Sequence, residues 1–590
     1  MFVLYFYHTQ MRCTMEILEN LKGLAEDRQF LKALNVLANE LEDMKKSKFS
    51  IIKNKLAKIS SVEDFKLLIR LFDRGVMYQY SGFLARYAHR RFKTLQTAIW
   101  YCDELIDSGR SLEANYIITE YLKKMPHEAE TELRISALFT EVHSLLELKR
   151  TKEAVKKLVE MEAISEKPIW DKLGFYYLQI GDRAKAESHL TAGLRDEERG
   201  LACYLLLSDL YASNGGGGKS LQTIKEGMEV HPQAPALKLE LIRRYRDFGL
   251  HEDMLAEMSE LDRLVPFHSY ECYFEHLRAL SYYQKDELEK LHHFISQKKM
   301  KDSPFSGDKG FSETGDAVKL SINPIVQKSN YCVPASFEML FSYFGKKETQ
   351  DDIAEHIFDV TGSKLSASAE YLEKKGFAYR FFTGEKERYK ALLQQGIPII
   401  LSVDFEASSH VQVMIGIDER FGFYLVQDPN FLDTMYVPYG EFQKLAVNTN
   451  FLSIAAVPIE REAELEFLPM DDHLYYKKLH SLSEMVEEDI MKSEPAMADF
   501  LSSSMNEPYT LIYTLKFFSG DKHKEFIIKC SEKLLAIFPE SDFFKLYAAQ
   551  AYIRLNEIDR AEKTLSLVNR KTFSPLYQYL SGRIQMYKDQ

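Results

Sequence analysis

The chain has 590 residues, of which 45% are hydrophobic and 28% are charged, and a net charge of −12. This length exceeds what a single hydrophobic core supports, so several domains or a repeat array are expected. Lys and Arg are spread along the sequence without a concentrated basic block, which argues against nucleic-acid binding. The six cysteines form no CxxC pair and no metal-ligand spacing, which predicts reduced thiols and neither a metal nor another cofactor. They are Cys13, Cys102, Cys203, Cys272, Cys332 and Cys530.

The N-terminal sequence MFVLYFYHTQMRC contains a short apolar run that no basic residue precedes. This run is too short for an export signal or a membrane span. Met11 and Met15 follow closely, so any of Met1, Met11 and Met15 can be the first residue of the protein. No later segment has 18 consecutive apolar residues, and the sequence predicts a cytoplasmic protein that makes no contact with a membrane.

A repeat of about 34 residues is the most informative pattern in the chain. The first clear unit starts at Trp170, and its bulky and small positions recur in the next two units. Pro232 and Pro266 stand at the same phase of successive units, each where a second helix is expected to end. Tyr177, Tyr211 and Tyr245 repeat one bulky position and are expected to pack between helices rather than to bind a ligand. The residues that define the first unit are Leu173, Gly174, Tyr177, Gly181, Ala186, Leu190 and Gly193.

This pattern resembles the tetratricopeptide repeat, and the resemblance is clearest over 168–266 and 540–568. It extends to 95–166, whereas 15–94 and 475–538 show only the periodicity of amphipathic helices. The resemblance implies stacked helix pairs whose concave face binds a peptide or a partner protein. A spacer or a dimerisation module is the alternative use of such an array.

The helical pattern stops after Lys301 at the stretch DSPFSGDKGFSETGDA, whose Ser, Gly and Asp content predicts a mobile linker. A helix is expected from about Pro334 to Gly345, with proline in its first turn and glycine after its end. Three more helices are predicted over TQDDIAEHIF, SASAEYLEKKGF and EKERYKALLQQG. Strands are then predicted over IPIILSVDF, HVQVMIGID, GFYLVQD and TMYVPY, which together indicate an α+β domain.

Four polar residues of this segment point to nucleophilic catalysis. Cys332 directly precedes the predicted helix, where the helix dipole and a nearby imidazole would lower the pKa of a thiol. His410 begins one predicted strand and Asp428 ends the next, so the three can serve as nucleophile, base and orienting carboxylate. Gln327 lies in a turn five residues before the cysteine, from which its amide can donate to a developing oxyanion.

In combination these residues resemble the bacteriocin-processing (double-glycine leader) peptidase family and its standalone relatives in the papain-like clan. The resemblance implies that Cys332 attacks a peptide carbonyl, His410 accepts its proton, Asp428 orients the imidazole and Gln327 completes the oxyanion hole. Family members often have glycine where this chain has Val333, which bears on substrate choice. The chain contains no Walker-type GxxxxGK[ST] motif of an associated transporter. The matching residues are Gln327, Cys332, Pro334, Ala335, Gly345, Gly396-Ile397-Pro398, His410, Gly416 and Asp428-Pro429.

The predicted fold is mainly α, with tetratricopeptide-like helical arms on both sides of a central α+β papain-like domain. The expected domains are a helical repeat domain at 1–300, a linker at 301–318, a cysteine-peptidase domain at 319–460 and a C-terminal helical repeat domain at 461–590. The predicted function is cleavage of a peptide or protein that the repeats recruit, through an acyl-enzyme, and the resemblance implies a bacterial protein. Two alternatives stay open: acyl or amide transfer by the same triad, and a non-enzymatic peptide-binding regulatory or scaffold protein.

Overall fold

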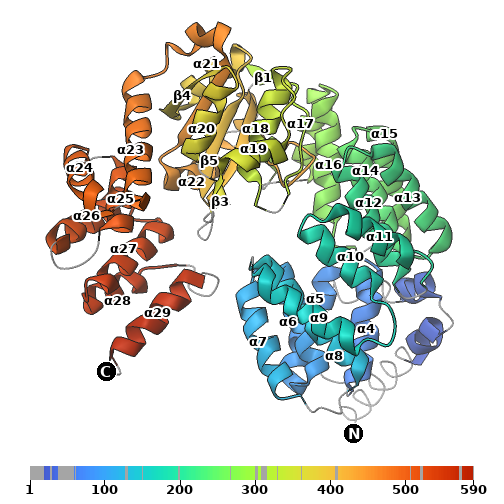
Figure 1. The fold of residues 1–590 in the computed structure, drawn as a ribbon. Coiled ribbons are helices and arrows are strands. Elements are labelled where there is room, and N and C mark those ends of the chain that lie inside the picture. Colours follow the sequence, from blue (N-terminus) through green and yellow to red (C-terminus); the bar gives the residue numbers. More distant parts are fainter. Residues whose placement is uncertain are drawn as a thin grey trace. The chain divides into compact units, whose positions relative to one another are not determined.

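The chain folds into two compact units, Met1–Lys298 and Lys299–Gln590. Figure 1 shows the fold of the chain, taken from a computed structural model. The residues that the structure describes are 19–26, 29–36, 59, 61–125, 130–148, 150–196, 199–265, 268–298, 300, 303–306, 315–328, 330–359, 362–363, 365–404, 409–488, 490–504, 507–518, 523–569 and 575–588. Cys13 and the candidate starts Met1, Met11 and Met15 lie outside them.

The first unit is helical throughout its described part, as the repeat pattern predicts (Figure 1). Most neighbouring helices pack on one another along the array, and α6, α10 and α12 also pack on the next helix but one. The helices are α4 Val62–Arg74, α5 Tyr78–Phe92, α6 Leu95–Asp107, α7 Ser111–Lys123, α8 Thr131–Glu147, α9 Thr151–Ile164, α10 Trp170–Gln179, α11 Arg183–Gly193, α12 Gly200–Ser213, α13 Gly217–Val230, α14 Pro235–Asp247, α15 His251–Leu264, α16 Glu271–Gln284 and α17 Leu288–Lys298.

The period of the repeat is fixed at the turn inside each helix pair. The second helices α11, α13 and α15 begin 34 residues apart, at 183, 217 and 251. Gly181, Gly215 and Gly249 precede them with φ of 81°, 73° and 69°. This left-handed conformation costs a residue with a Cβ about 1–2 kcal/mol, so glycine suits each of these turns. Tyr211 and Tyr245 are both only 9% exposed, which confirms their predicted packing role.

The helical array of the first unit returns to its own beginning. The turn between α4 and α5 meets the turn that precedes α16, 190 residues later in the chain. Ser269 N donates to Val76 O over 2.9 Å, and Gln79 N donates to Ser269 Oγ over 3.2 Å. The rings of Tyr78 and Tyr270 pack edge to face, with centroids 6.2 Å apart. The inner face of the array is therefore bounded by helices from both ends of the unit.

The second unit contains a sheet in which every strand pairing is antiparallel, with strand order β4-β9-β5-β6-β7-β8 and with β1 also on β6. Gly416 allows β1 to approach β6, because a Cβ at this position would lie 2.4 Å from Val318 O. The strands are β1 Ala317–Lys319, β4 Phe377–Thr383, β5 Ile399–Asp404, β6 Ser409–Asp418, β7 Phe423–Gln427, β8 Met435–Pro438 and β9 Leu452–Pro458, and β2 Phe358–Asp359 and β3 Gly362–Ser363 form a separate pair.

Five helices of the segment from α18 to α22 surround this sheet. The first four were predicted and α22 was not, and the predicted separation of helices from strands fails where β4 lies between α20 and α21 and where α22 precedes β9. Of the sheet strands, β5, β6, β7 and β8 were predicted, whereas β1, β4 and β9 were not. The helices are α18 Cys332–Tyr343, α19 Gln350–Ile357, α20 Leu365–Lys374, α21 Lys386–Gln394 and α22 Tyr439–Ala446.

The segment predicted as a mobile linker contributes to the folded unit at both of its described ends. A short 3₁₀ helix, η1 Pro304–Ser306, places Phe305 in the core at 1% exposure. Its ring packs against Phe423 and Tyr436 with centroids 5.9 and 5.4 Å away. The other end of the segment forms β1. The composition of the stretch is that of a linker, but one aromatic residue and one short strand are enough to anchor it.

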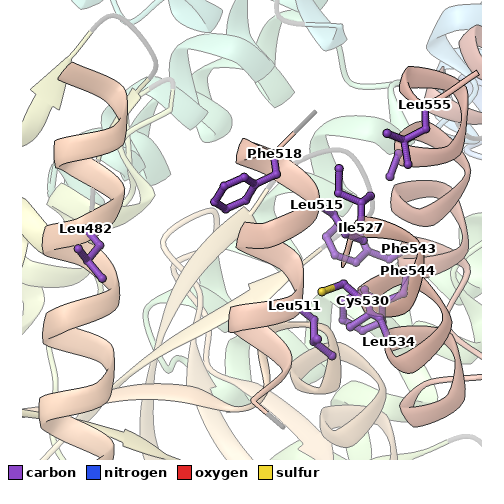
Figure 2. Close-up of a cluster of buried hydrophobic side chains, with 11 residues drawn as sticks. Leu482, Leu511, Leu515, Phe518, Ile527, Cys530, Leu534, Phe543, Phe544 and Leu555 are labelled. Atoms are coloured by element: carbon purple, nitrogen blue, oxygen red, sulfur yellow. The ribbon is translucent and has the colours of Figure 1, made fainter. Parts of the chain in front are cut away.

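Helices again make up the rest of the second unit. Helix α23 packs on β4, where His473 Nδ1 accepts from Phe381 N over 3.2 Å and Asp472 accepts from Thr383 N over 3.0 Å. Figure 2 shows the apolar cluster that joins α23, α25, α26 and α27, with Phe544 and Leu534 at 0% exposure. The helices are α23 Met470–Glu488, α24 Ile490–Ser503, α25 Pro508–Phe517, α26 Lys524–Ile537, α27 Asp542–Arg554, α28 Ile558–Ser566 and α29 Pro575–Lys588.

In the described part of the chain, no helix combines the length and the apolar character that crossing a membrane requires.

Candidate active site

Cys332 is the first residue of α18, at the end of the helix that carries the partial positive charge of its dipole. The sequence predicted a start near Pro334, but the helix begins two residues earlier, because proline fits the first turn of a helix without loss of a hydrogen bond. The side chain of Cys332 is half-buried. Ser336 Oγ donates to Val411 O over 3.2 Å, which holds α18 against β6 beside the position of His410.

His410 lies at the beginning of β6, and Asp428 directly follows β7. The two strands pair with Val413 opposite Gln427, and this register continues to Asp428 opposite Gln412. His410 is then the diagonal neighbour of Asp428 on the same face of the sheet. His410 Nε2 lies 3.1 and 3.0 Å from the two carboxylate oxygens of Asp428. Both side chains are buried, with exposures of 8% and 3%.

The thiol of Cys332 lies near the same imidazole and affects its pKa. Burial alone would lower the pKa of His410, but hydrogen bonds to Asp428 and Cys332 and their charges raise this pKa to about 9. Burial alone would raise the pKa of Asp428, yet its hydrogen bond with His410 holds that pKa below its ordinary value. Because Nε2 faces Asp428, Nδ1 is the ring nitrogen that remains for the thiol. The structure thus brings three of the predicted site residues close together.

Gln327 lies in the segment between β1 and α18, and its backbone ties it to the Asp-Pro turn. Gln327 N donates to Pro429 O over 2.8 Å. The buried side chain of Gln350, on α19, fixes the same segment from the other side. It accepts from Lys328 N over 2.8 Å and donates to Val326 O over 3.1 Å. Gln327 is therefore held on both sides within a site that spans α18, α19 and the end of β7.

Asn430 connects Gln327 with the other site residues. Gln327 Nε2 donates to Asn430 Oδ1 over 2.6 Å, and Asn430 N donates to Asp428 Oδ1 over 2.7 Å. Asn430 Nδ2 also lies 3.4 Å from His410 Nε2. All four predicted site residues thus belong to one connected group of side chains.

Sequence reasoning did not find Gln412, Asn430 or Gln350. Gln412 was detectable, because it is the polar residue of the apolar run VQVMI and stands two positions after His410, on the same face of the strand. It is 4% exposed and donates to Asp428 Oδ2 over 2.5 Å. Asn430 and Gln350 act through turns and helix ends, so no periodic pattern marks them.

A cavity of about 340 Å³ opens at the N-terminal end of α18, where Tyr331 directly precedes Cys332. The rings of Tyr331 and Phe358 lie against each other with centroids 5.0 Å apart. Helix α19 contributes the remaining wall. The lining residues are Tyr331, Asp351, Ala354, Glu355 and Phe358.

The other described cysteines differ from Cys332 in burial or in surroundings. Cys102, Cys203 and Cys530 are buried within helices of the repeat arms. Burial raises the pKa of the Cys203 thiol to about 12 and that of Cys530 to about 11. Cys272 is exposed on α16. Among the described cysteines, Cys332 is the one whose thiol raises the pKa of a histidine that a carboxylate also holds.

Comparisons with known proteins find a family match over the segment that contains these residues. The model of the Peptidase_C39 like family matches residues 319–452. A double-glycine motif protease from an AMS/PCAT transporter, solved with its leader peptide, is 18% identical in sequence. The match covers 24% of this chain and 94% of the protease, with a TM-score of 0.21. The peptidase domain of Streptococcus ComA is 16% identical in sequence. Its match covers 23% of this chain and 97% of the ComA domain, with a TM-score of 0.21.

A tetratricopeptide-repeat protein from Thermus thermophilus has 19% identity to the chain, covers 29% of it and 92% of its own length, and has a TM-score of 0.25. TM-scores of this size do not by themselves establish a shared fold. No curated protein is significantly similar in sequence to the chain. The family match and the geometry agree on the same segment, and residues 319–452 are a Peptidase_C39 like domain carried between two sets of helical repeats.

Proposed function

We propose that the protein is a cysteine peptidase in which Cys332 is the nucleophile, His410 the general base and acid, Asp428 the orienting carboxylate and Gln327 an oxyanion donor. One observation carries this proposal: the imidazole of His410 is hydrogen-bonded to the carboxylate of Asp428 and lies near enough to the thiol of Cys332 for the thiol to raise its pKa. A thiol in this position gives its proton to the imidazole and becomes a thiolate. The carboxylate fixes the ring and stabilises its charged form.

The reaction would run through an acyl-enzyme. Cys332 Sγ forms a bond to the carbonyl carbon of the substrate, and the electron pair of the carbonyl moves to its oxygen. The C–N bond then breaks, and the leaving amine takes the proton from His410. In the second half, His410 removes a proton from water as the water oxygen attacks the thioester carbonyl carbon. The C–S bond then breaks, the acid product leaves, and the proton on His410 restores the Cys332 thiol. In the alternative reaction, acyl transfer, an amine would attack the thioester in place of water.

The raised pKa of His410 supports these roles. An imidazolium with a pKa of about 9 stays charged at neutral pH and stabilises the thiolate beside it. The same group then holds the proton that the leaving amine needs. The burial of the His410–Asp428 pair strengthens this pairing, because water does not compete for its hydrogen bonds.

The inner face of the first unit supports recruitment of a peptide. Desolvation raises the pKa values of Asp73, Asp103 and Asp107, that of Asp103 to about 7, although the three side chains keep contact with solvent. Within the described residues, none of these carboxylates forms an ion pair. Desolvation raises the pKa values of Tyr78 and Tyr270, and the charge of Asp107 adds a smaller increase to both. The two tyrosines belong to opposite ends of the array, so Asp107 lies near both ends.

Such a face favours a partner of opposite charge. A lysine or arginine side chain would relieve the repulsion between the carboxylates and would lie beside two tyrosine rings. An extended peptide with a basic residue therefore fits this face better than an acidic one. We also propose that the protein acts in the cytoplasm.

The proposal is tested by the appearance of new peptide termini. A proteome-derived peptide mixture is incubated with the full chain, with Cys332→Ala and with Cys272→Ala as a control at an exposed thiol. New N-termini should appear with the unchanged protein and with Cys272→Ala, and they should be absent with Cys332→Ala. Equal products from all three proteins would reject a peptidase that uses Cys332. Amide-linked conjugates in place of new termini would assign acyl transfer.

A further inference from the structure

Asn430 stands where the imidazole, the carboxylate and the oxyanion donor of the proposed site meet. Its backbone N–H bonds to Asp428 Oδ1 over 2.7 Å, so the residue cannot move without the carboxylate. Its carboxamide touches both His410 Nε2, at 3.4 Å, and the terminal amide of Gln327, at 2.6 Å. Every atom of this carboxamide therefore faces a group with a proposed role in the reaction.

The contact with His410 brings two donors together. The pKa of Asp428 is depressed, so its carboxylate is ionised at neutral pH and accepts a hydrogen bond from the N–H at Nε2. Nε2 is then an N–H donor, and Asn430 Nδ2 is a donor as well. A carboxamide oxygen at that position would instead accept from the imidazole and would stabilise its charged form.

The second observation concerns Gln327. Its Oε1 atom is buried and accepts no hydrogen bond in the described part of the chain. Buried polar atoms without a partner are rare in folded proteins and call for an explanation. An oxygen in this position would repel an oxyanion, whereas a nitrogen in the same position would donate to one.

A half-turn of both carboxamides changes both contacts at once, because nitrogen and oxygen exchange places while the shape of each group stays the same. Asn430 Oδ1 then accepts from His410 Nε2, and Asn430 Nδ2 donates to Gln327 Oε1. Both N–H groups of Gln327 are left for a new acceptor, at the position that has no protein partner.

We infer that Asn430 is the positioning residue that turns the amide of Gln327 toward the oxyanion, by accepting from His410 Nε2 and donating to Gln327 Oε1. This inference rests on the proposed function. It adds a residue outside the predicted triad, and it assigns a direction to the hydrogen bond between Asn430 and Gln327 that the reaction requires.

The variant Asn430→Asp separates the two directions, because it keeps the shape of the side chain but contains only acceptors. If Asn430 donates to Gln327, the aspartate forces Gln327 to turn its N–H groups away from the oxyanion. If Asn430 accepts from Gln327, the aspartate accepts equally well and little changes. Asn430→Ala can neither donate to Gln327 nor accept from it, so the amide of Gln327 is free to turn either its oxygen or its N–H groups toward the oxyanion.

Two reactions of Cys332 in the full chain give the measurement. Acylation by 4-nitrophenyl acetate passes through an oxyanion and is followed as a burst of nitrophenol, with Cys332→Ala as the blank. Alkylation by iodoacetamide passes through no oxyanion and reports the thiol–imidazole pair alone. The ratio of the two rates therefore isolates oxyanion stabilisation from folding and from thiol reactivity.

The expected ratio falls in the order wild type, Asn430→Ala, Asn430→Asp, with a loss of about a hundredfold for the aspartate, as for removal of one oxyanion donor. Adding Asn430→Asp to Gln327→Ala should cause no further loss. The control Asn214→Asp, an exposed position on the first unit, should keep the wild-type ratio. A ratio for Asn430→Asp within about threefold of wild type, or an order in which alanine loses more than aspartate, would overturn the inference. Absence of a Cys332-dependent burst in the wild type would instead reject the proposed function.

Discussion

Gln412 Nε2 donates to Asp428 Oδ2 over 2.5 Å, from a position two residues after His410 on the same strand. The carboxylate of Asp428 is therefore held from both sides, by the imidazole of His410 and by an amide that does not titrate. This arrangement keeps a buried carboxylate ionised and in place without a second charge.

Replacing Gln412 with leucine should weaken the site through Asp428. The carboxylate loses one of its hydrogen bonds, so its pKa should rise, and the thiolate–imidazolium pair should lose part of its support. The lost bond to a buried charged group should cost about 2 kcal/mol of stability. Chemical denaturation and the rate of Cys332 alkylation measure the two effects. Gln412→Glu is the companion variant, and it should be worse, because it sets two carboxylates 2.5 Å apart. Wild-type alkylation rates in both variants would show that Gln412 has no part in the site.

Activity and stability should both decline as the pH rises through about 9. The pKa of His410 in the folded chain is about 9, above the ordinary histidine value of 6.5. A raised folded pKa stabilises the protein fully below the unfolded pKa, and that contribution is lost as pH rises from about 6.5 through about 9. The general-acid proton disappears over the same range. A pH series of denaturation midpoints checks this, with His410→Gln as the control. The difference between wild type and variant should shrink as pH increases, and a constant difference would contradict the assignment.

Substitution by alanine should destabilise the protein at the turn glycines of the repeats but not at a neighbouring glycine within a helix. Gly215 has φ of 73° and should lose about 1–2 kcal/mol of stability on substitution by alanine. Gly218, three residues later on α13, has open space around its Cβ position. Gly218→Ala should stabilise the helix by about 0.5–1 kcal/mol, since alanine loses less backbone freedom on folding. Thermal unfolding of the two variants gives the comparison, and equal midpoints would refute the role of the turn.

The inner face of the first unit should select basic peptides. Asp107→Asn should weaken binding of an arginine-containing extended peptide several-fold, because one carboxylate of the inner face loses its charge. Glu63→Gln is the matched control, since this residue lies on α4 with a side chain that is 76% exposed. Fluorescence anisotropy with the arginine peptide and its glutamine counterpart measures the effect. If the two peptides bind alike, or if both variants lose affinity equally, the carboxylates do not select the partner.

The sequence was sufficient to predict those parts of the site that depend on element ends. Cys332, His410 and Asp428 stand at a helix start and at two strand ends, and such positions carry turn and capping signals that one sequence contains. The strands β4 and β9 escaped prediction. The sequence FAYRFFT of β4 is almost continuously buried and shows no alternation, so it does not differ in pattern from a buried helix.

Contacts between distant turns account for what the sequence did not reveal. Asn430 and Gln350 are polar residues near helix and strand ends, where polar residues are ordinary, and their importance arises from partners about 20 to 100 residues away. Phe305 lies in a stretch with the composition of a linker, and its burial depends on β7 and β8, which follow more than a hundred residues later. No local propensity encodes such pairings.

The contact between the last helices of the first unit and its first turn is another long-range contact that the sequence did not reveal. Val76 and Ser269 meet because small rotations between successive helix pairs accumulate along the array. The period of 34 residues predicted the pairs but not the sum of their rotations.

The most direct test of the central claim is a covalent one. The full chain is mixed with 4-nitrophenyl acetate, quenched with acid and mapped by mass spectrometry for the acetyl group. The account predicts an acetyl thioester on Cys332, its loss in His410→Ala, and no comparable label on the exposed Cys272. Acetylation of Cys332 that persists unchanged in His410→Ala, or labelling of Cys272 at an equal rate, would contradict the claim that the thiol–imidazole–carboxylate group of this domain is a catalytic triad.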